Sequence, residues 1–491
     1  MSVNPEFDKL KSTECVTVSA SSGVECKLPI TEEEAKNVIS SEISTYLISS
    51  ECLNKEIKYS GRAVFTVLYK SGEEIKKYEA GVEYSFKFDC DKSLEGMPVL
   101  ADVKGDNVKI TFLNGIVTAS AVILFTGELS KPNDLEFFVK DPNLTVKNKS
   151  VDYSYEVCKI KRECKIEDEF DLDLLIKDVL FHKEKAYSLS CTCGIGSIIV
   201  DGEIELTALI NPLEEGKEPI LEARKIPFRL EVDSSDSLPD LLSSCFVVVK
   251  NCNLKVYVDE NKNKSAVSVE LVLEVNASLY ALNSFSLAVD AYSNECEIKI
   301  NKECKDLSKV IGFKCGEDRV KSEISFDVDK NSRLICPIND RIEDVKYSID
   351  DNGVLIVGVM TVTCLFLGET LFTDSITFPF SAKINIEGNK IFAHKIQALN
   401  LKVTKTFIEF DLKLCFTDIC NTPINFINAI EEGQKRKVND SAISVFIPTK
   451  DDSLWDISKA LGVKEEEILI SNPDLEFPLT GNERIVVYRE K

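Results

Sequence analysis

The sequence predicts a multidomain, mainly β protein in which three β-rich repeats precede a small module of two strands and two helices. Three observations support this: a short string that recurs at a domain-sized interval, segments with alternating apolar residues, and a change of composition near residue 430. At 491 residues, the chain is long enough for three or four domains of about 150 residues each.

The recurring string begins with Asn and has Lys two positions later. It occurs at Asn107–Ile110, Asn253–Val256 and Asn400–Val403, so that the intervals are 146 and 147 residues. A near-constant interval of this size indicates an internal repeat as large as a domain.

Two further elements accompany each string and predict strands. Alternating segments follow the strings, and alternation over ten residues is typical of half-buried antiparallel strands. These segments are residues 116–125, 266–275 and 407–416. A glycine that leads into a β-branched run precedes each string, at Gly61–Tyr69, Gly202–Ile210 and Gly358–Phe366. We therefore predict β-rich repeats over residues 1–150, 151–290 and 291–430.

Seventeen cysteines raise the question of a disulfide framework. Their number is odd, and they are spread from Cys15 to Cys420 without the dense spacing of small secreted scaffolds. The N-terminal residues contain no apolar core of a secretion signal. We therefore expect reduced cysteines in a cytoplasmic protein. The string Glu-Cys-Lys recurs around Cys26, Cys164 and Cys304, and we interpret it as a repeated core position rather than a metal or redox site.

Composition excludes several function classes. Acidic residues outnumber basic ones by 82 to 59, and the net charge of −23 opposes nucleic-acid binding. The longest apolar run, near Val354–Val362, is about half the length of a membrane span, so we predict none. Cys191-Thr-Cys193 has no second pair nearby, and His182 lies nine residues from it, so we predict no metal. No phosphate-binding loop is present, and neither His182 nor His394 has a recognisable partner. We predict a non-enzyme without cofactors.

The C-terminal tenth of the chain differs from the repeats. Residues 431–441 are polar and predict an exposed linker, and residues 442–491 predict a separate module. Val445–Ile447 is a short strand, and Ser453 with Asp456 predicts the capped start of a helix that Gly462 ends. A second helix over residues 464–470 and a closing strand over residues 484–488 complete the module.

These residues carry a resemblance. Asp452–Ser458, Asn472-Pro473 and Gly481–Ile485 resemble, in order and spacing, the motifs of the LysM module, a βααβ fold. Asp451 departs from the pattern because the family usually has Gly there, and Pro448 stands where a strand Val is usual. The resemblance implies that glycans containing N-acetylglucosamine bind between two loops. The site residues implied are Asp451, Asp452, Ser453, Leu454, Trp455, Ile457, Ser471, Asn472, Pro473, Asp474 and Leu475.

Trp455, the single tryptophan, has two interpretations. It could stack on a sugar, or it could pack under the first helix as part of a small core. The flanking Leu454 and Ile457 favour packing.

The repeats, joined to such a module, resemble the DUF3794 (SPOCS) proteins of spore-forming bacteria. This resemblance implies a structural adaptor of spore coat morphogenesis, on the mother-cell side of the forespore surface, that recruits a polymerising coat ATPase. The alternative is a protein of the cell or spore wall that binds peptidoglycan. We favour a protein partner because a cytoplasmic module does not meet wall glycan in the ordinary way.

Overall fold

Alternating apolar residues form long antiparallel strands, and the prediction of a mainly β protein is confirmed by the computed structural model. The structure describes residues 4–11, 13–71, 74–132, 135–214, 217–259, 264–350, 353–436 and 443–488. The helices among these residues are short: α1 (Glu32–Lys36), α2 (Leu454–Leu461) and α3 (Glu465–Ser471). None of the described helices has the length and apolar composition needed to cross a membrane.

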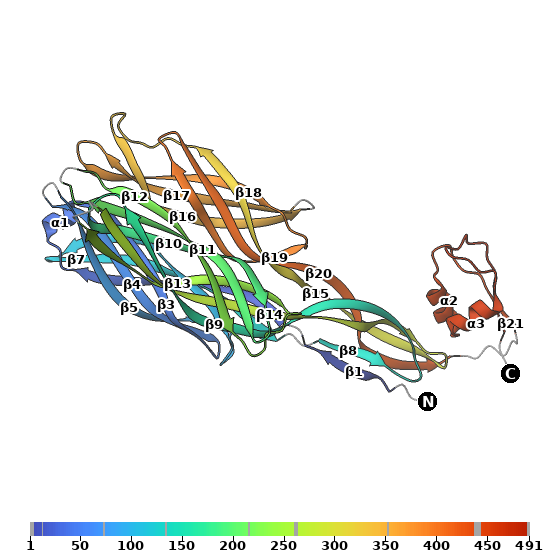
Figure 1. The fold of residues 1–491 in the computed structure, drawn as a ribbon. Helices are drawn as coiled ribbons and strands as arrows, with labels where there is room; N and C mark the ends of the chain where they lie inside the picture. Colours follow the sequence, from blue (N-terminus) through green and yellow to red (C-terminus); the bar gives the residue numbers. More distant parts are fainter. Residues whose placement is uncertain are drawn as a thin grey trace.

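Six three-stranded sheets of the described chain form three pairs, and each pair has the same strand order. One sheet of a pair consists of three consecutive strands. In the other sheet, the last strand of the six lies between the first and the fifth, as in the order β2-β7-β6. We call the pairs units 1, 2 and 3 (Figure 1).

The strands of the units have the following bounds. Unit 1 contains β2 (Thr13–Leu28), β3 (Val38–Leu53), β4 (Glu56–Ser71), β5 (Glu74–Asp89), β6 (Val99–Leu113) and β7 (Ile116–Pro132). Unit 2 contains β9 (Thr145–Leu172), β10 (Ile176–Cys193), β11 (Ser197–Pro212), β12 (Ile220–Asp233), β13 (Leu242–Asp259) and β14 (Lys264–Tyr292). Unit 3 contains β15 (Cys296–Glu323), β16 (Arg333–Asp350), β17 (Gly353–Leu367), β18 (Leu371–Ile384), β19 (Lys390–Val403) and β20 (Phe407–Lys435).

The recurring sequence elements occupy the same strands in each unit. The glycine-led runs lie on the central strands β4, β11 and β17, and the alternating segments lie on the central strands β7, β14 and β20. The strings that begin with Asn lie on the edge strands β6, β13 and β19. Each unit buries its own apolar core, and Phe65, Val269 and Phe410 are among the residues at the three centres.

The glycine at the start of each run has a physical reason. Gly61, Gly202 and Gly358 pair with Tyr84, Phe228 and Phe380 on the following strand, and the aromatic ring lies against the glycine. The preceding strand has a register shift at the same level. A Cβ on Gly202 would lie 2.3 Å from the carbonyl oxygen of Tyr187 and from the Phe228 ring. A Cβ on Gly61 would lie 2.1 Å from the Tyr46 carbonyl oxygen, so units 1 and 2 need glycine at this position, whereas the approach at Gly358 is looser, with the Glu343 carbonyl oxygen at 3.2 Å.

Four strands, β9, β14, β15 and β20, are much longer than the other strands of the units. They have 28 or 29 residues, which at about 3.3 Å per residue is roughly 90 Å. Past the register shift at Leu279/Tyr280, the rest of β14, up to Tyr292, pairs with β9 as one ribbon. The part of β15 from Cys296 to the register shift at Val310/Gly312 pairs with β20 as a second ribbon. A third ribbon, β1 (Glu6–Leu10) with β8 (Leu135–Lys140), runs beside them. We call the three ribbons the stalk, which extends away from the units in Figure 1.

The predicted boundaries between the repeats do not coincide with the ends of strands, because the strands continue into the stalk. The ends of the predicted repeats at residues 150, 290 and 430 fall inside β9, β14 and β20. Residues 431–435, predicted as part of a linker, continue β20 and pair with β15 from Cys296 onward. The polar composition is misleading here because a two-stranded ribbon exposes most of its side chains.

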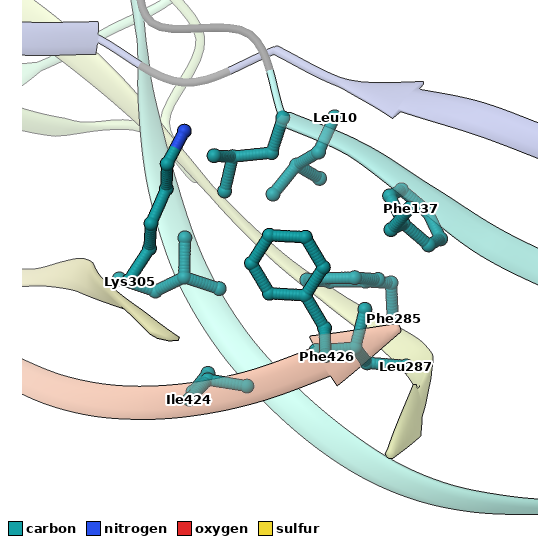
Figure 2. Close-up of a pocket in the computed structure, with 9 residues that line it drawn as sticks. Leu10, Phe137, Phe285, Leu287, Lys305, Ile424 and Phe426 are labelled. Atoms are coloured by element: carbon teal, nitrogen blue, oxygen red, sulfur yellow. The ribbon is translucent and has the colours of Figure 1, made fainter. Parts of the chain in front are cut away.

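Apolar side chains from all three ribbons pack together inside the stalk, as Figure 2 shows. Leu10 and Phe137 come from the first ribbon, Leu287 from the second, and Ile424 and Phe426 from the third. The cavity among them measures about 10 Å³, which is room for roughly one water molecule. The cavity is therefore a packing gap and not a ligand site.

A polar junction joins the three units. Asn339 of unit 3 donates to a carboxylate oxygen of Glu42 in unit 1 at 2.6 Å and accepts from Lys183 of unit 2 at 2.8 Å. Asp340 accepts from Lys183 at 3.0 Å and lies 2.8 Å from the Lys185 ammonium. Because the partners come from different units, this network ties the units into one body.

The buried carboxyl of Glu42 should make the stability of the protein depend on pH. Burial raises the pKa of its carboxyl to about 7, against the attraction of Lys183. A carboxyl with a raised pKa binds more protons when folded, so its contribution falls as pH rises from about 4.5 to 7. We expect Glu42→Gln, which keeps the acceptor for Asn339, to raise the free energy of unfolding at pH 8 by roughly 2–3 kcal/mol.

Urea unfolding of both proteins between pH 4 and pH 8 measures this effect. The gain should vanish near pH 4, where the wild-type carboxyl is protonated in both states. A gain that is independent of pH would contradict the role of ionisation.

The seventeen cysteines are free thiols in the structure. The interpretation of Glu-Cys-Lys as a repeated core position holds only in part: the half-buried Cys26 and Cys164 pack against the cores of units 1 and 2, whereas Cys304 is exposed. Their partners on the paired strands, Ala119, Leu273 and Asn425, also lie at different levels of the units.

Candidate functional site: the C-terminal module and its dock

The C-terminal module folds from local signals that the sequence shows. β21 (Ile443–Phe446) pairs with β22 (Ile485–Tyr488), and α2 and α3 lie between them in the chain. The predicted capping box is confirmed, since the Ser453 hydroxyl and the Asp456 carboxylate bond to each other's backbone amides. Gly462 adopts the predicted left-handed conformation, with φ of 65°. Ile457, Ile468 and Ile485 are among the apolar residues of the module core.

The first predicted binding loop is organised by its own hydrogen bonds. The Asp452 carboxylate accepts from the Thr449 amide at 2.7 Å, and Ser453 caps α2. Leu454 packs against the module core, and Ile457 is fully buried in it. Of the residues predicted here, Asp451 is the most open to solvent. Ile457 is therefore a core residue and not a ligand contact, and Leu454 is partly buried at the edge of the same core.

The second predicted loop is held by Asn472. Its side-chain amide donates to the carbonyls of Ile468 at 2.8 Å and Val486 at 2.7 Å, and its side-chain oxygen accepts from the Val486 amide at 2.8 Å. Asn472 therefore fastens the end of α3 to β22 and has a structural role.

The other residues of this loop differ in exposure. Pro473 and Asp474 are exposed, Ser471 is half-buried, and Leu475 packs on the core. Of the predicted site residues in the two loops, Asp451, Pro473 and Asp474 are well exposed, and Glu476 and Phe477 at the end of the second loop are exposed as well.

Trp455 lies at neither of the positions considered for it. Its side chain is 7% exposed, and it packs edge-on against Tyr292 at the end of β14, with ring centroids 5.1 Å apart. The indole N–H donates to the Asp290 carboxylate at 2.8 Å. The tryptophan is buried, as the packing interpretation expects, but against the stalk instead of inside the module core. In this arrangement its ring cannot stack on a sugar.

Further contacts complete this interface, which we call the dock: Asp290 and Tyr292 of the stalk with Trp455, Lys459 and Val463 of the module. Lys459 donates to both oxygens of Asp290 at 2.8 Å, and the Tyr292 hydroxyl donates to the Val463 carbonyl at 2.7 Å. Burial disfavours the charge of Asp290, but the bonds from Lys459 and Trp455 hold the pKa of its carboxyl below the usual value. The module is therefore seated at the far end of the stalk by matched polar groups around one aromatic pair.

The dock could not be found from sequence patterns. Asp290 is a lone acid in the apolar stretch Ala288-Val289-Asp290-Ala291, and that is its only signal. Its partners Trp455 and Lys459 are 165 and 169 residues away in the chain.

Fluorescence of the single tryptophan reports on the dock. We expect Tyr292→Ala to shift the Trp455 emission to longer wavelength and to increase its quenching by acrylamide, because the indole loses its apolar neighbour. The control is Tyr488→Ala, which removes an exposed tyrosine of the module and should leave emission unchanged. Equal spectra for wild type and Tyr292→Ala would contradict the docked arrangement.

The outer side of the module sheet is apolar and open. Ile443, Val445 and Ile447 lie at alternate positions along β21 and its continuation, and Tyr488 pairs with Ile443. Ile447 is 70% exposed. We call these four residues the apolar face. Such a face is typical of a surface that contacts another protein.

Comparison of the chain with protein-family models, with curated proteins and with solved structures finds no match.

Proposed function

We propose that the protein is a non-enzymatic structural adaptor whose stalk presents the C-terminal module to a protein partner. The observation that carries the proposal is the placement of apolar groups in the module. Trp455, the residue best suited to stack on a sugar, is buried in the dock, whereas the apolar face is open. An open apolar strand surface that includes an exposed tyrosine suits a protein partner, because the buried centre of a protein interface is rich in apolar and aromatic side chains.

The identity of the partner rests on resemblance. The LysM-like module and the SPOCS-like repeats of the sequence imply a polymerising spore coat ATPase, which the protein would recruit to the forespore surface from the mother-cell cytoplasm. The shared strand order of units 1, 2 and 3 supports a tandem repeat of one domain type. A rigid body of three units would add further contacts, and several weak contacts to a polymer raise overall avidity.

Capture of the purified coat ATPase by the immobilised full-length chain tests the proposal. We expect Val445→Asp and Ile447→Asp to weaken capture at least tenfold and to leave the fold intact, because both side chains are exposed. The control is Ile195→Asp, since Ile195 is 84% exposed on unit 2, outside the module. Deletion of residues 444–489 should abolish capture.

Sedimentation with purified peptidoglycan separates this proposal from the alternative, a glycan-binding protein of the cell or spore wall. We expect the full-length chain to stay in the supernatant. Sedimentation that is lost on substitution of Asp451 and Asp474, together with capture unaffected by Ile447→Asp, would overturn the proposal. Asn472→Ala is unsuitable for this purpose because Asn472 holds α3 to β22.

A further inference from the structure

His182, Glu184 and Cys252 form a cluster that neither the predicted site nor the proposed function uses. His182 and Glu184 are two residues apart on β10 and point to the same side of the strand. Cys252 lies on β13, 70 residues after His182. One imidazole nitrogen, one carboxylate oxygen and the thiol sulfur lie within 4.8 Å of one another.

The donor set has the chemistry of a transition-metal site. Imidazole, carboxylate and thiolate are the three side-chain types that bind zinc in proteins. In a tetrahedral site the ligand atoms are about 3.5 Å apart, so the cluster needs only small side-chain movements to close on an ion. His182 and Glu184 are mostly buried, and Cys252 is half-buried, which limits competition from water.

The surroundings also favour a cation. His182 already bonds to Glu184, and the acid Glu79 of unit 1 acts on the same imidazole. Tyr46 of unit 1 lies close enough to Glu184 and Cys252 for both to raise the pKa of its phenol, although burial is the larger cause. Lys77, which forms an ion pair with Glu79 at 3.2 Å, is a positive group close to His182. The cluster is thus on unit 2, at the surface that meets unit 1.

The second histidine gives an internal comparison. His394 also pairs with a carboxylate, that of Glu128, at 2.8 Å. Its other ring nitrogen lies 2.7 Å from the Thr417 hydroxyl, so both nitrogens are engaged. It belongs to no group of three potential ligands in the described chain. A histidine–carboxylate pair alone is a structural hydrogen bond, and the nearby thiol is what distinguishes His182.

We propose that His182, Glu184 and Cys252 bind one Zn²⁺ ion where unit 2 meets unit 1. The ion replaces the proton on the thiol and the one shared by His182 and Glu184, so binding weakens as pH falls. With three protein ligands, the fourth position is left for water or for a group of unit 1.

Metal titration of the full-length chain, stripped of metal with a chelator and kept reduced, tests the site. We expect one Zn²⁺ per chain by calorimetry, and a Co²⁺ complex whose absorption includes a sulfur-to-cobalt band. Cys252→Ser should remove that band and weaken Zn²⁺ binding at least tenfold. His182→Asn should also weaken Zn²⁺ binding at least tenfold. The controls are Cys164→Ser, which changes another half-buried thiol of unit 2, and Cys304→Ser, which changes an exposed one.

A third variant and thermal melting complete the test. Glu184→Gln should weaken binding while the thiolate band persists, because the sulfur remains. Thermal melting without metal checks that each variant is folded, and Zn²⁺ should raise the melting temperature of the wild type but not of Cys252→Ser. No binding to the wild type, or binding that Cys252→Ser and His182→Asn leave unchanged, would overturn the proposal.

Discussion

Gly202→Ala is expected to destabilise the protein by about 3 kcal/mol, because the added methyl group would overlap backbone that cannot move. The Cβ would lie 2.3 Å from the Tyr187 carbonyl oxygen, which is part of the ladder between β10 and β11, and equally close to the Phe228 ring. The midpoint of urea unfolding, followed by circular dichroism, measures the loss.

Gly23→Ala is the matched control for this substitution. Gly23 is exposed on β2, and no heavy atom lies within 4 Å of an added Cβ. Alanine there restricts the unfolded chain and should leave stability equal or slightly higher. If the two variants unfold at the same midpoint, the close approach of strands at Gly202 is not a determinant of stability.

The second large effect is expected from Asp340→Ala, at about 3 kcal/mol of destabilisation. Asp340 is the shared acceptor of Lys183 and Lys185, and its loss leaves two largely buried ammonium groups without their carboxylate. Although burial disfavours its charge, the two lysines hold the pKa of this carboxyl well below its usual value. Its contribution is therefore present above about pH 4 and is lost as pH falls further.

Thermal melting at pH 7 and at pH 3 checks this prediction, and the gap between wild type and Asp340→Ala should narrow at the lower pH. Asp173→Ala provides the control, because Asp173 forms an ion pair with Lys264 on the surface, where solvent screens the attraction. A melting temperature for Asp340→Ala no lower than that of Asp173→Ala would show that the junction does not hold the units together.

Sequence patterns predicted the local elements well. Alternation located the central strands, and the spacing of Ser453, Asp456 and Gly462 predicted both ends of α2. These signals work because a strand's exposed side and a helix's caps depend on residues two to four positions apart.

Boundaries and side-chain partners were predicted less well. The repeats were divided inside β9, β14 and β20 because the stalk continues the alternation of the units without a break. The motif predicts Leu454, Ile457 and Asn472 as binding residues, whereas in the structure Leu454 and Ile457 pack on the module core and Asn472 fastens α3 to β22. A motif shows that a residue type recurs at a position, and it does not distinguish ligand contacts from the contacts that hold the loops.

The sequence by itself determined that the protein is mainly β, that similar segments recur along it, and that a capped helix lies in its C-terminal module, because each of these properties depends on neighbours along the chain. Only the tertiary structure decided that Trp455 faces Asp290 in the dock and that Cys252 lies beside His182 and Glu184. It also decided that Asn339 and Asp340 of unit 3 meet Glu42 of unit 1 and two lysines of unit 2. The physical reason is that a buried polar group needs a partner, and the chain supplies that partner from a distant strand whose position depends on the whole fold.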